Sequence, residues 1–339
     1  MLNGEHADLG LLAAHAGEHA YLRSLAAHAG IDATGIDPPA ARRVQINGLD
    51  FRYLEWGKPD APTIVLLHGG GQSAHTWDAC CLVLARRYRC LALDQRGHGD
   101  SEWSPEGAYA IEDHVRDLEA FVARVALPGA MLVGMSMGGI NAIAYAARHP
   151  SRLRLLVAVD IGPDVQFEPV QRMLRGLSAY RQFKSPRDAA ERLSAMGARR
   201  SKLLLEQTLS RNLREQRAGS WTWKYDPRTL MDLSAEDILN PRKPLWGALS
   251  GITCPVLVVR GAASEIFLAA DAAKFARHLL RGECVTVANA RHSVQTDNPL
   301  GLAEAIMTFD DCLTGRTRPK TCHRTGTDTP ALAAGDITR

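Results

Sequence analysis

Short runs of apolar residues recur along most of the chain, with longer amphipathic stretches between them. The runs that contain almost no polar residue are 63–67, 90–93, 130–133, 155–159, 256–259 and 284–287. Apolar runs of this length without alternation are typical of strands buried on both faces, as in a parallel sheet covered by helices. Stretches of helical composition lie between them, at 78–88, 112–126, 137–148, 269–280 and 299–313. Strands that alternate with helices in this way predict a doubly wound α/β sheet.

Residues 43–55 follow a different pattern, in which apolar and polar residues alternate on either side of Asn47-Gly48. Alternation is typical of a strand with one buried face, and Asn-Gly is a preferred two-residue hairpin turn. We therefore expect two antiparallel strands ahead of the first buried strand.

One long interval, 163–245, contains no buried-strand run. It has helical segments at 165–183, 187–196 and 202–216, and we expect a turn at Trp221–Trp223. An all-helical insertion at this point would form a cap over the carboxyl edge of the sheet. In open α/β sheets that edge is where ligands bind.

The two ends of the chain differ from this body. Residues 1–41 are rich in Ala, His and Gly and have helix-forming composition over 9–29, whereas the last residues are polar and without periodicity. Such a tail is expected to be disordered. The predicted division is a helical extension over 1–41, an α/β core over 42–162 and 246–314, a helical cap over 163–245 and a disordered tail over 315–339.

Composition excludes several classes of protein. Hydrophobic residues make up 46% of the chain and charged residues 23%, with a net charge of +3, which indicates a globular protein without nucleic acid as a partner. The seven cysteines show no regular spacing and no CxxC motif, so we expect neither a disulfide framework nor a metal site. The first residues do not resemble a signal peptide, and no apolar run approaches the ~18–20 residues that span a bilayer. We expect a cytoplasmic protein without a membrane partner.

Residues 134–138, GMSMG, match the pattern G-x-S-x-G between a predicted strand and a predicted helix. The glycines permit a sharp turn that exposes the Ser136 hydroxyl, and the helix N-terminus adds partial positive charge where an oxyanion would form. Alone, this short match is equally compatible with a glycine-rich turn that holds a buried serine. In the functional interpretation Ser136 is a nucleophile.

Residues 68–71, HGGG, follow another predicted strand, and their glycines leave room for a substrate oxygen near the backbone. The expected oxyanion donors are the backbone N–H groups of Gly70 and Met137. His292 follows the last predicted strand and comes after Ser136 in the chain, as the order Ser, acid, His requires. It is the candidate general base.

Together these motifs resemble the α/β-hydrolase superfamily over residues 42–314. The resemblance rests on HGGG with Trp77 downstream, DQRGHGDS at 94–101, GMSMG, and His292 followed by DNP at 297–299. It implies an eight-stranded, mostly parallel sheet flanked by helices, with a helical cap after strand six. It also implies that Asp94 and Arg96 brace the loops around the nucleophile, so Asp94 and His98 are not counted as catalytic.

The resemblance leaves the catalytic acid at an unusual place. In many members of the family the acid stands at the position of Ser264 in RGAASEIF, whereas in another branch it follows strand six, where this chain has VDIGP at 159–163. The chain is similar to small esterases with V-D-I-x-P and R-G-x-x-S, which implies Asp160 as the acid with Ser264 beside it. Glu265 remains the alternative.

A serine nucleophile with a histidine base indicates acyl transfer through an acyl-enzyme, and it disfavours dehalogenases and epoxide hydrolases of this fold, which use Asp. No metal cluster or nucleotide loop appears, so no cofactor is expected. The expected partner is a small-molecule ester or lactone, and weaker resemblance extends to esterases that open bulky macrolide lactones. Gly71, His75 and Phe167 are candidate substrate contacts. Thioester, amide or C–C bond hydrolysis, and a non-catalytic ligand-binding protein, remain alternatives.

Overall fold

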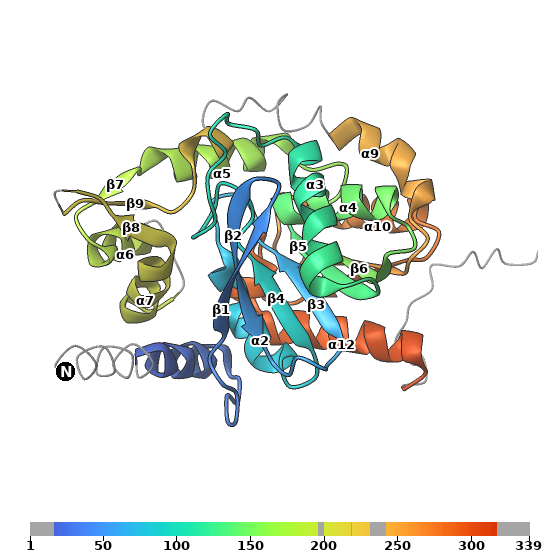
Figure 1. The fold of residues 1–339 in the computed structure, drawn as a ribbon, viewed down its shortest axis with the longest axis horizontal. Helices are drawn as coiled ribbons and strands as arrows, with labels where there is room; N and C mark the ends of the chain where they lie inside the picture. The colour runs from blue at the N-terminus through green and yellow to red at the C-terminus, as the bar shows by residue number, and fades with distance from the viewer. Residues whose placement is uncertain (1–16, 196–199, 218, 231–241, 317–339) are drawn as a thin grey trace, which may run out of the picture.

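A computed structural model describes residues 17–195, 200–217, 219–230 and 242–316. Its centre is an eight-stranded sheet in the order β1-β2-β4-β3-β5-β6-β10-β11 (Figure 1). The pairs β1–β2 and β2–β4 are antiparallel and the other neighbours are parallel. The strands are β1 Ala40–Ile46, β2 Leu49–Trp56, β3 Thr63–Leu67, β4 Arg89–Leu93, β5 Ala130–Met135, β6 Leu153–Val159, β10 Val256–Gly261 and β11 Gly282–Val287. The predicted mostly parallel sheet is confirmed.

The hairpin that joins β1 and β2 turns at Asn47 and Gly48, as the sequence predicts. Both residues have positive φ, 49° and 81°, and Ile46 pairs with Leu49 across the turn. A two-residue turn with two positive φ values matches the twist of the flanking strands, which explains the preference for Asn-Gly at this point.

Helices cover both faces of the sheet, and each face has its own hydrophobic cluster. One face packs against α3 Ile111–Phe121, α4 Met137–Arg148, α9 Lys243–Ala248 and α10 Ala269–His278. The other packs against α2 Asp78–Leu84 and α12 Pro299–Thr314. Shorter elements connect them: the 3-10 turns η1 Ala74–Trp77, η3 Pro227–Thr229 and η5 Leu249–Gly251, the π-helical turn η2 Val122–Ala126 and the short helix α11 Val294–Asp297.

The last helix, α12, shows why these segments begin and end where they do. The Asn298 side chain accepts a hydrogen bond from the Gly301 N–H at 2.9 Å, and Pro299 occupies the first helical position, where its missing N–H costs nothing. The helix ends at Gly315, whose φ of 72° is a conformation that favours glycine.

The insert after β6 is mainly helical, as predicted, with α5 Phe167–Ala179, α6 Pro186–Ala195 and α7 Lys202–Asn212. It also holds a three-stranded antiparallel sheet, β7-β9-β8, from Gln182–Phe183, Trp221–Trp223 and Leu213–Glu215. The expectations of a turn at Trp221–Trp223 and of an all-helical cap are therefore wrong. Strands of two or three residues are too short to show alternation, and β7 pairs with β9 across a long stretch of chain, as in Phe183 with Trp221.

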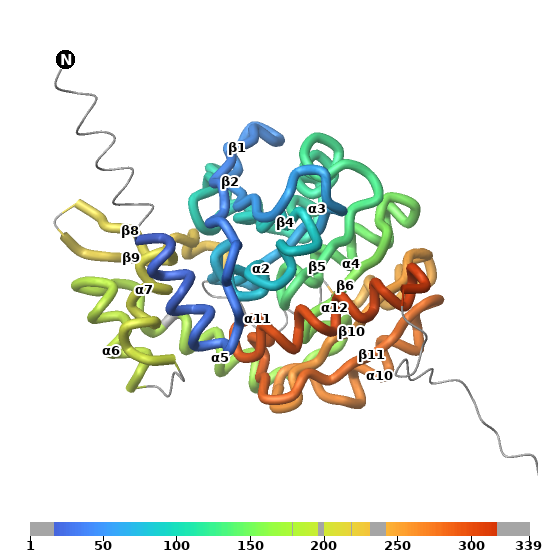
Figure 2. Tube along the Cα trace, turned by 90° about the horizontal axis from the view of Figure 1, so that it is seen from below, coloured from blue at the N-terminus to red at the C-terminus, as the bar shows by residue number. Residues whose placement is uncertain are grey.

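A helix over residues 17–29 precedes the sheet, and the rest of the predicted 9–29 helix lies outside the described residues. Its Tyr21, Leu22, Leu25 and Ala26 are buried in the hydrophobic cluster that contains α2 and Leu204 of α7. Figure 2 shows this helix lying alongside α7. Most of the predicted tail, 317–339, also lies outside the described residues. Among those the structure describes, no helix combines the length and apolar character needed to cross a membrane.

Candidate active site

Ser136 lies at a sharp turn between β5 and α4, at the carboxyl edge of the sheet. Its φ is 51° and its ψ is −119°, a conformation that non-glycine residues rarely adopt. The flanking glycines are needed for close packing, because a β-carbon on Gly134 would lie 2.3 Å from the Gly138 carbonyl oxygen. A β-carbon on Gly138 would lie 2.6 Å from the carbonyl oxygens of Leu67 and His68. The turn has the geometry expected of a G-x-S-x-G motif between a strand and a helix.

His292, in the loop between β11 and α11, connects Ser136 to Asp160. Its Nε2 lies 3.1 Å from Ser136 Oγ, and its Nδ1 lies 2.9 Å from Asp160 Oδ2. Because a carboxylate can only accept, Nδ1–H donates to Asp160 and the Nε2 lone pair faces the Ser136 hydroxyl. The three residues come from three separate strand ends, and the structure brings them into one hydrogen-bonded chain.

The Asp160 carboxylate is fully buried, at 0% exposure, and has two partners besides His292. Its Oδ1 accepts the Gly261 N–H at 2.8 Å, and its Oδ2 accepts the Ser264 hydroxyl at 2.5 Å. Buried carboxylates are costly unless they are hydrogen-bonded, and these donors satisfy the oxygens of Asp160. Ser264 therefore lies beside the Asp160–His292 contact.

Glu265, the alternative acid, points elsewhere. Its carboxylate pairs with Arg172 of α5, and the Glu265 side chain is 70% exposed. Neither carboxylate oxygen contacts His292 among the described residues. The geometry thus favours Asp160 over Glu265 as the partner of the histidine.

The candidate oxyanion donors lie on two sides of Ser136. The N–H groups of Gly70 and Met137 donate to no acceptor in the described parts of the chain, so both are free to bind an oxygen atom. A β-carbon on Gly69 would lie 3.3 Å from Ser136 Cβ, which shows how closely the HGGG loop approaches the serine.

Buried polar groups hold this loop from behind. His68 Nε2 accepts the Gln95 N–H at 3.0 Å, so its Nδ1–H donates to the Gly69 carbonyl at 2.8 Å. Gln95 Nε2 also donates to the His68 carbonyl, and Asn141 Nδ2 donates to Gln95 Oε1. Burial lowers the pKa of His68 to about 4, opposed by the hydrogen bond to Gly69, so the ring is neutral at pH 7.

The turn after β4, DQRGHGDS, contacts the same loop. Asp94 Oδ1 accepts the Ala74 N–H at 2.6 Å, and Arg96 forms a buried ion pair with Asp117 of α3. His98 is buried against His68, and burial together with that neighbour lowers its pKa to about 3. These contacts are structural in kind, as the resemblance implies for Asp94 and Arg96.

The three candidate substrate contacts have different surroundings. His75 is 9% exposed and both ring nitrogens have protein partners, since Nδ1 contacts Asp78 at 2.9 Å and Nε2 contacts Arg52 at 3.2 Å. A polar network in the core therefore engages the His75 ring, and its role as a substrate contact stays a prediction. Phe167, at the start of α5, is 42% exposed, and its role as a substrate contact stays a prediction.

Gly71 has a φ of 73°, and a β-carbon there would lie 3.2 Å from Leu230 and 3.6 Å from Leu177 and Tyr225. Leu230 also lies 3.2 Å from the β-carbon position of Gly70. These three insert residues cover the HGGG loop with apolar and aromatic groups. Sequence reasoning missed them, because neither their type nor their spacing distinguishes them from residues of the insert's own core.

Gln72 and Gln295 were also missed. Gln72 Oε1 accepts the Gly69 N–H at 3.1 Å and also lies 3.3 Å from Nε2 of Gln295. Gln295 belongs to α11, the short helix just after His292. Nothing in the sequence marks a lone glutamine as a support of this kind. No group of three metal-ligating side chains is found among the described residues.

Comparison with known proteins identifies the family to which the chain belongs. A family model described as the alpha/beta hydrolase fold matches residues 62–299. Esterase Rv0045c of Mycobacterium tuberculosis is 34% identical over 278 residues, covering 79% of this chain and 88% of the relative. A crystal structure of that esterase has a TM-score of 0.70 and covers 87% of this chain and 98% of its own.

A second relative is 2-(acetamidomethylene)succinate hydrolase of Mesorhizobium japonicum, which is 28% identical over 275 residues, or 80% of this chain and 95% of the relative. A crystal structure of E-2-(acetamidomethylene)succinate hydrolase has a TM-score of 0.72 at 26% identity and covers 80% of this chain. The sheet, the insert after β6 and these matches agree with the resemblance drawn from the sequence, and the chain belongs to the α/β-hydrolase fold family.

Proposed function

We propose that the protein is a serine esterase that hydrolyses neutral carboxylic esters through an acyl-enzyme on Ser136. The observation that carries this proposal is the unbroken chain of hydrogen bonds from Ser136 Oγ through His292 to Asp160. The proposed ester hydrolysis agrees with the activity in the name of the esterase that is 34% identical to this chain over most of its length.

In the proposed reaction Ser136 Oγ attacks the ester carbonyl carbon while its proton passes to His292 Nε2. Asp160 accepts the Nδ1–H and stabilises the imidazolium that forms. The tetrahedral intermediate collapses, the C–O bond breaks, and His292 gives its proton to the leaving alkoxide. Water then attacks the acyl-enzyme, again deprotonated by His292, and releases the acid and Ser136.

The N–H groups of Gly70 and Met137 would stabilise the negative charge on the carbonyl oxygen. Both belong to backbone that is fixed before substrate binds, so little reorganisation is needed during reaction. Losing one such donor in an enzyme of this kind costs roughly 10²–10³ in turnover.

The surroundings of the HGGG loop favour an uncharged acyl group. Leu177, Tyr225 and Leu230 cover Gly70 and Gly71. The neighbouring cations Lys224 and Arg228 are already paired, with Asp100 and Asp226. A substrate carboxylate near these leucines would lose hydration, and Lys224 and Arg228 would offer it no unpaired charge. Lactones, as internal esters, fit the same chemistry, and a bulky lactone is the finer alternative that a substrate panel must test.

We also propose that residues 163–245 act as a cap that selects substrates. Its small sheet and a hydrophobic cluster of its own, which includes Phe183, Leu205, Leu209 and Leu213, support this assignment.

The test combines a fluorophosphonate probe with a panel of esters and lactones. The panel contains acetate, butyrate and hexanoate esters, a hemisuccinate ester, a small lactone and a macrocyclic lactone, with mass spectrometry to detect addition of water. We expect labelling of Ser136, and faster turnover of neutral acyl esters than of the hemisuccinate. Ser136→Ala should abolish both signals, whereas Ser151→Ala, at an exposed serine, should change neither.

Absence of labelling in the wild-type protein would overturn the esterase proposal and favour a non-catalytic ligand-binding protein of the same fold. Retention of more than about a tenth of wild-type turnover by Ser136→Ala would contradict the assignment of the nucleophile, because triad members act as a unit.

A further inference from the structure

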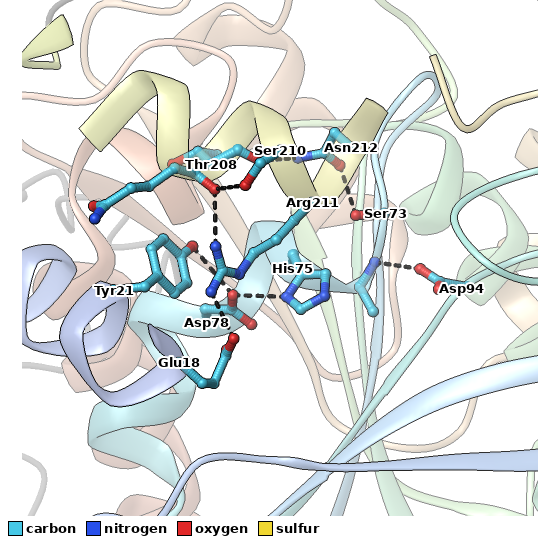
Figure 3. Close-up of polar contacts among 12 residues, drawn as sticks. Glu18, Tyr21, Ser73, His75, Asp78, Asp94, Thr208, Ser210, Arg211 and Asn212 are labelled. Atoms are coloured by element: carbon cyan, nitrogen blue, oxygen red, sulfur yellow. Dashed lines mark hydrogen bonds and ion pairs between the residues drawn. The ribbon is translucent and has the colours of Figure 1, made fainter. Parts of the chain in front are cut away.

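A hydrogen bond joins the insert to Ser73, close to the HGGG loop. The Ser73 hydroxyl, on a residue that is only 2% exposed, donates to Asn212 Oδ1 at 2.6 Å (Figure 3). Asn212 is the last residue of α7, and its Nδ2 donates to the Thr208 carbonyl one turn earlier in the same helix. The amide is therefore fixed on the helix and presents its oxygen to the core.

Ser73 directly follows the loop that carries Gly70. Gln72 closes that loop, because its N–H donates to the Gly69 carbonyl at 3.2 Å and its side chain accepts the Gly69 N–H at 3.1 Å. On the other side, the Ala74 N–H donates to Asp94 at 2.6 Å. Ser73 is thus the point where the insert takes part in holding the loop.

Residue 211, beside Asn212, joins α7 to the N-terminal helix. The Arg211 guanidinium lies 3.5 Å from the centre of the Tyr21 ring, and its Nη2 pairs with Glu18 Oε2 at 2.6 Å. The Arg211 side chain is 16% exposed, so this pair is screened by solvent less than a surface pair would be. Figure 3 shows Arg211 between Glu18 and Tyr21.

Tyr21 continues the connection into the core. Its hydroxyl donates to Asp78 Oδ2 at 3.2 Å, and the same oxygen contacts His75 Nδ1 at 2.9 Å. Burial and the negative charge of Asp78 raise the pKa of Tyr21, so its hydroxyl stays protonated and keeps donating. The N-terminal helix therefore binds both α7 of the insert and α2 of the core.

We propose that Asn212 is a positioning residue for the HGGG loop, and that helix 17–29 holds Asn212 in its position through Arg211. This inference rests on the proposed esterase function, in which Gly70 stabilises the oxyanion. The residues that do this, Glu18 and Tyr21, lie outside the 62–299 segment that matches the family model. Their contribution is thus a feature of this chain beyond the matched segment.

The expected effect is smaller than the loss of an oxyanion donor, because the donor would be displaced rather than removed. We expect Ser73→Ala and Asn212→Leu each to lower kcat by about tenfold, well below the 10²–10³ of a deleted donor. KM should change by less than about twofold. The double variant should lose no more than either single one, because both remove the same hydrogen bond.

A boronic acid inhibitor, which forms a tetrahedral adduct with the serine, separates positioning from general damage. Its affinity should fall in parallel with kcat in both variants, since the adduct oxygen occupies the oxyanion position. The matched control is Ser210→Ala on the same helix, whose hydroxyl donates to the Gln207 carbonyl and to no other acceptor among the described residues. This control should keep wild-type kcat and inhibitor affinity.

Arg211→Met keeps an unbranched apolar side chain but removes the guanidinium and its charge. It should give the same signature on a smaller scale, about threefold in kcat, and should not add to the effect of Asn212→Leu. Additive losses would contradict the idea that Arg211 acts through Asn212.

Hydrogen–deuterium exchange tests the loop without relying on activity. The peptide 68–77 should exchange faster in Ser73→Ala and Asn212→Leu than in wild type, and at the wild-type rate in Ser210→Ala. Unchanged exchange, or a loss of thermal stability with kcat and boronate affinity intact, would overturn the inference and leave the esterase proposal standing. A wild-type protein that takes no probe, but shows the predicted exchange, would instead overturn the esterase proposal alone.

Discussion

Strands β6 and β10 are parallel neighbours in the sheet, and either could have supplied the acid for His292. The end of β6 carries Asp160, whose buried carboxylate accepts hydrogen bonds from three donors. The end of β10 carries Ser264 and Glu265, of which the first donates to Asp160 and the second faces solvent with Arg172. One strand end provides the charge, and the other provides donors that stabilise it.

The difference teaches that a carboxylate near an active site is defined by its surroundings rather than by its presence. Asp160 is desolvated, so its interaction with His292 is screened little, whereas Glu265 and Arg172 are surface groups whose pairing is worth little. Asp160 also has a positive φ of 51°, and its N–H donates to the Val259 carbonyl of β10 at 2.7 Å. The neighbouring strand thus holds the unusual backbone in place.

The largest effect is expected for Asp160→Asn. The asparagine amide could turn its NH₂ toward Nδ1 of His292, and the histidine would then no longer be fixed in the tautomer with a proton on Nδ1. The Nε2 lone pair would no longer face Ser136. Turnover should fall by roughly 10³–10⁴ while the fold is kept, as measured by ester hydrolysis and circular dichroism. Near-normal turnover in this variant would remove Asp160 from the proposed triad.

The ends of β3 and β4 offer a second contrast, because their histidines are buried and neutral. The pKa of His68 is lowered to about 4 and that of His98 to about 3, so the folded protein resists protonation that the unfolded chain accepts below about pH 6.5. The two histidines therefore do not reduce the unfolding free energy above pH 6.5, and they reduce it increasingly as the pH falls toward 4. Near pH 5 each histidine should lower the unfolding free energy by about 1.4 kcal/mol per pH unit.

Urea unfolding at pH 8, 7, 6 and 5 measures this dependence. His98→Asn should reduce the slope by about one proton, because it removes one of the two buried neutral rings. A pH-independent unfolding free energy between pH 7 and 5 would show that these rings are not held neutral.

A carboxylate can be returned to the β10 end to sharpen the first comparison. Ser264 Oγ lies 2.5 Å from Asp160 Oδ2, so an aspartate at 264 would bring a carboxylate oxygen close to His292. We expect Asp160→Asn combined with Ser264→Asp to recover at least about tenfold over Asp160→Asn alone, since the tautomer would again be fixed. Ser264→Asp in the wild-type background should be harmful, because two carboxylates would then share one site.

A smaller loss is expected for Ser264→Ala. It removes one donor to the buried carboxylate and keeps the Gly261 N–H and His292, so turnover should fall by about tenfold, the equivalent of one hydrogen bond to a charged group. The kinetic comparison uses the same ester as for Asp160→Asn. A loss as large as that of Asp160→Asn would mean that Ser264, rather than the carboxylate, determines the geometry.

The smallest effect is expected for Glu265→Gln, which should change turnover by less than about twofold. The side chain is 70% exposed and its only described partner is Arg172, also at the surface. Arg172→Gln is the matched control and should behave in the same way. A loss above about tenfold, together with near-normal activity of Asp160→Asn, would return the acid to the end of β10.

Much of this protein follows from local sequence. Apolar runs without alternation specify strands that must be covered on both faces, Asn47-Gly48 specifies a hairpin, and G-x-S-x-G between a strand and a helix specifies a sharp turn at Ser136, because each of these patterns is local. The order of Ser136, Asp160 and His292 along the chain was likewise readable. The three-stranded sheet of the insert was not, because its strands are short and β7 pairs with β9 across a long stretch of chain.

Other features were decided only when distant segments met. Whether Asp160 or Glu265 approaches His292 depends on side-chain direction at two adjacent strand ends, and a one-residue difference along a strand reverses that direction. Three other contacts could not be predicted from the sequence for the same reason. They are the polar network around His75, the contact of Leu230 with Gly70 and Gly71, and the stacking of Arg211 on Tyr21. Local composition sets which elements form, whereas burial and hydrogen bonding between residues far apart in the chain decide which polar groups are left free to act.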